Sequence, residues 1–131
     1  DKAEMKELLT IILDTYDAEA AAKGLPNDLA LALVSFVAYN RYVFSEAKDK
    51  SMPPFEQIRE LRNTIAEYTA QNGSFDKMTN PQRQEMYESL VMLGVFTHLI
   101  YEEAKKTNNA QALKTIKQMA KQNLNSVGIN P

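Results

Sequence analysis

The 131-residue chain contains no cysteine, only four glycines and a single histidine. The absence of cysteine excludes disulfide bonds, zinc–thiolate sites, covalent haem attachment and a thiol nucleophile. Four glycines are too few for the glycine-rich loops that hold nucleotide phosphates. We therefore expect no cofactor, and no metal site is predicted.

The chain also has no excess of positive charge and no long apolar run. It carries 15 basic and 17 acidic residues, for a net charge of −2. Nucleic-acid binding needs a clustered basic surface, and the lysines of residues 105–121 follow the outward side of an amphipathic helix. We expect no nucleic-acid partner. The apolar runs are too short to cross a bilayer, so no membrane span is expected.

Two apolar helical stretches are the most informative feature of the sequence. Residues 29–44 read LALALVSFVAYNRYVF and residues 90–101 read LVMLGVFTHLIY. Each is too apolar for a surface helix of a small domain, which predicts two central helices of a bundle. Each also carries polar residues inside its apolar run, and buried polar groups are costly unless they have partners. These polar residues are Asn40, Arg41, Thr97 and His98.

Helix-breaking residues and the helical spacing of apolar residues predict five helices. They extend over about residues 2–23, 29–47, 54–71, 80–106 and 110–127. Asn27 or Asp28 is expected to cap the second helix, and Asn80 the fourth. Pro54 is expected to begin the third helix. No alternating strand pattern occurs. We predict one all-α domain spanning residues 1–131, a five-helix, mainly antiparallel bundle with the second and fourth helices central.

Catalytic chemistry is poorly supported by the sequence. His98 has Glu102 one turn further along, but Val95 stands where a Glu-x-x-His metal motif needs a carboxylate. A histidine bonded to its neighbour inside a bundle is the favoured interpretation. The serines lie in no strand–turn–helix elbow of the kind that hydrolases use. We expect the protein not to be an enzyme.

The polar midsection of the two central helices is a candidate small-ligand site. It predicts a closed cavity between these helices, lined by an apolar surface with a few convergent polar groups. The alternative is structural, with each polar side chain bonded to a neighbour. Gly94 has the same two interpretations, either a gap for a ligand or close packing against the alanines of the second helix. The candidate ligand-binding residues are Asn40, Arg41, Tyr87, Glu88 and His98.

A protein-binding module, such as an inhibitor or immunity-type partner, is the preferred functional class. It suits a small acidic domain without catalytic groups, although the partner itself is unknown. The class predicts an exposed apolar patch around two loops, one containing Met52 and Phe55 and the other Phe75 and Met78. The same residues also suit plain anchoring of helix ends.

Three segments resemble a bacterial, all-helical domain family of unknown function. They are residues 27–44, residues 83–88 (RQEMYE) and the closing residues 128–131 (GINP). The resemblance extends over about residues 27–131 and implies no catalytic residue. It implies that Asn40, Arg83, Gln84, Tyr87 and Glu88 hold the polar interior together. Together with the absence of an initiator methionine, it favours a periplasmic or secreted location.

Overall fold

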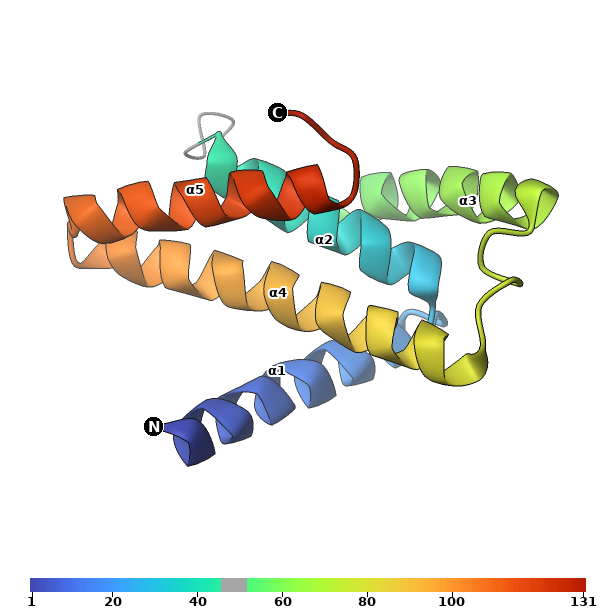
Figure 1. The fold of residues 1–131 in the computed structure, drawn as a ribbon, viewed down its shortest axis with the longest axis horizontal. Coiled ribbons are helices and arrows are strands. Elements are labelled where there is room, and N and C mark those ends of the chain that lie inside the picture. The colour runs from blue at the N-terminus through green and yellow to red at the C-terminus, as the bar shows by residue number, and fades with distance from the viewer. Residues whose placement is uncertain (46–51) are drawn as a thin grey trace.

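The computed structural model describes residues 1–45 and 52–131, which form five α-helices and no strand (Figure 1). The prediction of an all-α bundle is confirmed. The helices are α1 (Lys2–Ala22), α2 (Leu29–Phe44), α3 (Phe55–Asn72), α4 (Asn80–Lys106) and α5 (Ala110–Ser126).

The helix starts follow from local capping chemistry. Asp28 caps α2, because its carboxylate accepts a hydrogen bond from the Leu31 amide at 2.7 Å. At α4 the predicted cap is wrong by one residue. Thr79 is the cap. Its hydroxyl accepts a hydrogen bond from the backbone amide of Gln82, and the Gln82 side chain accepts one from the backbone amide of Thr79, which together form a capping box. Asn80 instead accepts a hydrogen bond from the Arg83 guanidinium.

Other predicted boundaries differ slightly from the structure. Pro54 is the cap of α3 and stands just before the helix, with extended backbone geometry. The predicted end of the second helix at residue 47, and most of the loop expected after it, lie outside the described residues.

Three helices form the centre of the molecule. α2 and α4 make the most extensive contact, and α5 packs on both of them. The outer helices are attached differently. Among the described helices, the backbone of α1 approaches α4 alone and that of α3 approaches α2 alone (Figure 1). The prediction that the second and fourth helices are central is confirmed.

The core consists of two apolar clusters along the central helices. One contains Ala32, Phe36, Tyr87, Leu90 and Val91, and the other contains Val43, Tyr101, Ile116 and Ala120. α3 contributes no buried residue to either cluster, and only Ile12 and Ala20 of α1 are buried. None of the helices in the described residues could span a membrane.

Gly94 lies at a close contact between α2 and α4. A Cβ atom at this position would stand 3.2 Å from the backbone Cα of Phe36 and 3.5 Å from the Tyr39 ring. The contact is thus with Phe36 and Tyr39, and not with the alanines of α2 that we expected. Phe36 and Tyr39 occupy the space beside Gly94, which favours the packing interpretation of this glycine over a ligand gap.

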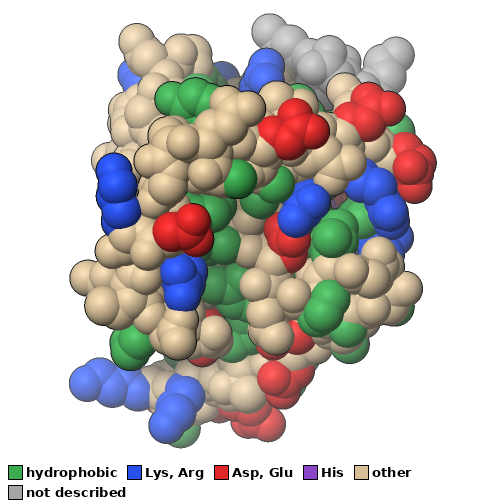
Figure 2. All heavy atoms as spheres, turned by 90° about the vertical axis from the view of Figure 1, so that its right-hand side faces the viewer, with side chains coloured by type: hydrophobic (Ala, Val, Ile, Leu, Met, Phe, Trp, Pro, Cys, Tyr) green, Lys and Arg blue, Asp and Glu red, His purple; other side chains and the backbone are tan. Residues whose placement is uncertain are grey.

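The surface carries charges of both signs around exposed apolar groups. Figure 2 shows one face, on which lysine or arginine and acidic side chains are intermixed around a central strip of apolar side chains. Charge is therefore not segregated by sign on this face. The distribution of apolar side chains is the more informative property of the surface.

Candidate functional site

The polar midsection is a buried hydrogen-bonded cluster shared by the three central helices. Asn40 and Thr97 are fully buried, and the Asn123 amide donates to the side-chain oxygens of both, at 3.0 and 3.3 Å. The Asn40 amide donates to the Phe36 carbonyl and the Thr97 hydroxyl to the Leu93 carbonyl. Because these groups satisfy one another, the cluster stabilises the packing of α2, α4 and α5.

Tyr87 and Glu88 face other parts of the structure. The Tyr87 hydroxyl donates to the Asp17 carboxylate of α1 at 2.6 Å, and its ring meets Tyr16 edge to face. Burial raises the pKa of both tyrosine hydroxyls, that of Tyr16 to about 12. Glu88 accepts a hydrogen bond from Gln84 on the surface. This tyrosine pair therefore fastens the second half of α1 to α4.

His98 lies in an aromatic cluster between α2 and α4. Its ring centroid is 5.1 Å from that of Tyr39 and 5.4 Å from that of Tyr42. Burial lowers the pKa of His98, although the Glu102 carboxylate, 3.6 Å from Nε2, acts in the opposite direction. The Tyr42 hydroxyl also donates to Glu102, at 3.2 Å.

Arg41 leaves the midsection altogether. It is exposed and lines a groove between α2 and α3, together with Met52 of the loop before α3. The five residues considered for one ligand site thus face different neighbours rather than a common space. All of them except Arg41 are occupied by contacts with other described residues of the protein.

The residues considered for partner binding do not form one patch. The Phe55 ring is covered by Lys23, whose ammonium lies 4.1 Å from the ring centroid, and by the Arg59 guanidinium at 5.0 Å. Phe75 and Met78 are half-buried in the linker between α3 and α4. Arg83 donates to the Phe75 carbonyl at 3.0 Å, so it fastens this linker and takes no part in the buried polar cluster.

The large exposed apolar side chains lie instead mainly on α1 and α4. Their exposed fractions are 44% for Met5, 39% for Leu8, 55% for Ile11, 45% for Leu93, 44% for Leu99 and 38% for Ile100. These six side chains are distributed over two adjacent helices of the described part of the chain. Leu61 and Tyr68 of α3 are the remaining two large apolar residues of this kind.

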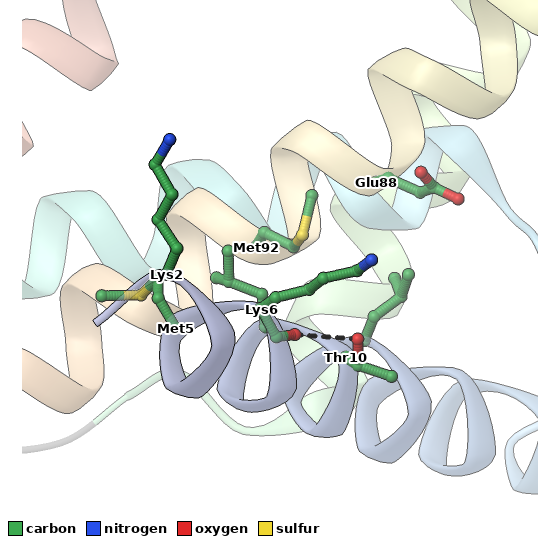
Figure 3. A pocket seen from close by; sticks show the side chains of 8 residues that line it. Lys2, Met5, Lys6, Thr10, Glu88 and Met92 are labelled. Carbon is green, nitrogen blue, oxygen red and sulfur yellow. Dashed lines mark hydrogen bonds between the residues drawn. The ribbon is translucent and has the colours of Figure 1, made fainter.

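A groove runs between α1 and α4 beside these side chains. It has a volume of about 570 Å³ and its walls include Met5, Leu9 and Leu13 of α1 and Met92 of α4. Figure 3 shows Lys2 rising from α1 and Lys6 running along it below Met92 of α4, and Figure 1 shows α1 diverging from α4 toward its N-terminus. Of the six exposed apolar side chains, Met5 is the one that lines this groove.

Acidic residues and the histidine do not assemble into a metal site in the part of the chain that the structure describes. No group of three potential ligands was found among these residues.

The architecture defines an all-α helical bundle whose two outer helices each pack on one central helix. The chain belongs to a family of unknown function (DUF6683), whose model matches residues 1–131. The match includes α1, which the resemblance over about residues 27–131 included less clearly. Comparison with curated proteins and with solved structures gives no match.

Proposed function

We propose that this protein is a non-catalytic protein-binding module, in which the opening between α1 and α4 receives an amphipathic helix of a partner. The observation that carries the proposal is the open groove between these two helices, whose walls include the apolar residues Met5, Leu9, Leu13 and Met92. An open groove with apolar walls typically marks an interaction site. A helix laid into an apolar groove is also a common mode of peptide recognition.

The spacing along α4 supports a continuous contact surface. Met92, Phe96 and Leu99 recur at intervals of four and three residues, so they share one side of the helix. Met92 forms part of the groove wall, and Leu99 continues the same side toward the end of α4. The buried residues Gly94 and Thr97 belong to the side that faces the bundle. α4 therefore has two apolar sides, of which α1 covers one only in part.

The groove also has a charge preference. Lys2 and Lys6 line it on the α1 side, and neither forms an ion pair in the described residues. Glu88 is the one acidic residue of the lining and lies on α4. The partner helix we propose therefore combines an apolar face with acidic residues along the edge that meets Lys2 and Lys6. Flexible methionines at positions 5 and 92 suit such an apolar contact.

A displayed library of helical peptides tests the proposal even while the partner is unidentified. We expect the selected peptides to carry apolar residues at positions i, i+3, i+4 and i+7 and acidic residues beside them. The Met5→Lys/Leu99→Lys double variant should lose binding, whereas the matched Tyr68→Lys change on α3 should leave it unaltered.

Three results would overturn the proposal. The first is that no helical peptide is selected, and the second is that the selected peptides bind the double variant equally well. The third is self-association of the protein, seen by sedimentation and lost in the double variant, because it would identify the occupant as a second copy. Bacterial origin and export stay predictions that rest on the sequence resemblance.

A further inference from the structure

A second groove lies on the opposite side of the central helices and has no part in the proposed partner surface. It has a volume of about 760 Å³ and runs between α2 and α3. Met52 and Pro53 line it on the loop side, and Val127 and Ile129 of the C-terminal tail also line it. Small-molecule sites in proteins typically enclose about 300–1,000 Å³, so the groove has the size of such a site.

The groove exists because α3 does not pack closely on α2. No residue of α3 is buried, and its apolar side chains Leu61 and Ile65 line the groove. Polar contacts hold the helix in place instead. Arg62 donates to both carboxylate oxygens of Asp28, with a closest approach of 2.6 Å. An apolar ligand could cover these side chains without displacing any contact that holds α3.

One cation stands at this apolar groove. Arg41 is the single charged residue of the described lining, it is exposed, and none of its contacts with described residues is an ion pair or a hydrogen bond. The neighbouring Tyr42 hydroxyl is occupied by Glu102, and the Ser45 hydroxyl donates to the Tyr42 carbonyl. A guanidinium binds a carboxylate through two parallel hydrogen bonds, which makes an acidic head group the matching chemistry.

We infer that the groove between α2 and α3 binds an amphiphilic carboxylate, with its apolar chain against Val37, Leu61 and Ile65 and its head group on Arg41. Because the groove combines one cation with a long apolar lining, it matches a ligand that has one acidic head group and an apolar chain. This inference is independent of the proposed partner surface, since the two sites share no residue.

Titration with three amphiphiles that share an apolar chain of about ten carbons tests this inference. Decanoate should bind and shift the amide resonances of residues in α2 and α3, and decyltrimethylammonium should not bind. Arg41→Gln should weaken decanoate binding about tenfold or more, because a charge-assisted hydrogen bond is lost. The same change should leave the weaker binding of decanol unaltered. Lys114→Gln on α5 removes an exposed cation that does not line the groove, and serves as the matched control.

The source of the carboxylate and the position of the chain can be separated in the same experiment. Ala38→Phe fills the groove and should abolish binding of both decanoate and decanol, with an unchanged helical circular dichroism spectrum confirming the fold. Vesicles containing an anionic phospholipid should not compete with decanoate if the ligand is a free acid. Equal affinity of the wild type and Arg41→Gln for decanoate, or decanoate shifts confined to α1 and α4, would overturn the inference.

Discussion

The molecule has two regions that differ in which side chains they bury and expose. One is the centre, formed by α2, α4 and α5, and the other consists of the outer helices α1 and α3. In the centre, Asn40 and Thr97 are fully buried and each has a hydrogen-bond partner. In the outer helices, large apolar side chains such as Ile11 and Leu61 remain exposed. The centre therefore accounts for most of the stability of the fold, and the grooves that remain available for binding lie where the outer helices meet it.

The largest expected effect comes from Gly94, at a close contact between α2 and α4. Gly94→Leu should destabilise the protein by about 3 kcal/mol, because the side chain would meet the Phe36 backbone, which cannot rotate away. Gly94→Ala should be milder, since a gain of about 1 kcal/mol in helix propensity offsets part of the strain. Urea unfolding measures both changes. Equal stability of Gly94→Leu and the wild type would show that a free space lies beside the glycine.

Asn40 tests the buried polar cluster. Asn40→Ala should cost about 2–3 kcal/mol, because it leaves the Asn123 amide short of a partner and opens a small cavity. Asn125→Ala, an exposed change on α5, is the matched control and should alter the unfolding free energy by less than about 0.5 kcal/mol. Similar losses in the two variants would remove the distinction between the centre and the surface.

Asp28 joins the two regions, because it caps α2 and holds α3 through Arg62. Asp28→Ala should cost about 1–2 kcal/mol through loss of the cap. Asp28→Asn keeps a capping oxygen and loses the ion pair, so it should cost about 1 kcal/mol or less. Thermal unfolding of the two variants measures the difference. If Asn at this position were as harmful as Ala, the ion pair and not the cap would dominate.

The lowered pKa of His98 predicts that the stability of the central helices depends on pH. Its pKa in the folded protein lies below the unfolded value of about 6.5, so the unfolded chain binds the proton more readily. The wild type should therefore lose stability relative to His98→Gln as the pH falls below about 6.5, until it passes the folded pKa. The titratable and charged groups around the His98 ring are Glu102, Lys105, Tyr39 and Tyr42. All four are present in both the wild type and the His98→Gln variant. If the difference in unfolding free energy between the wild type and His98→Gln did not change with pH, the lowered pKa of His98 would be contradicted.

The smallest expected effect lies on α1, where neighbouring residues differ in exposure. Ile11→Gln should change the unfolding free energy by less than about 0.5 kcal/mol, because Ile11 is 55% exposed. Ile12→Gln should cost about 2 kcal/mol or more, because Ile12 is only 5% exposed and its replacement buries a polar amide. Circular dichroism during urea unfolding measures both. Equal losses would mean that Ile11 is also covered.

The central helices were predictable because their signals are local. Residues 29–44 and 90–101 are apolar on all sides, which indicates buried helices, and Asn40 and Thr97 are indeed buried. The third member of the cluster, Asn123, was missed. Its own helix looks like an ordinary amphipathic one, and its contact with Asn40 spans 83 positions of the chain.

The grouping of the candidate site residues could not be predicted for a geometric reason. Successive residues of an α-helix point about 100° apart, so Asn40 and Arg41 reach different surroundings although they are neighbours in sequence. Tyr87 likewise depends on Asp17, a residue of the first helix. The apolar stripe of α1 is visible in the sequence, but which part of it α4 covers depends on the angle between the two helices.

Hydrogen exchange of the intact protein tests the central claim most directly, since it measures the stability of each helix separately. The account predicts that the slowest amides lie in α2, α4 and α5 and exchange only with global unfolding. Those of α3, and those of α1 before Ile12, should exchange first. Protection of α3 and the first half of α1 equal to that of α2 would contradict the division into a tightly packed centre and loosely attached outer helices.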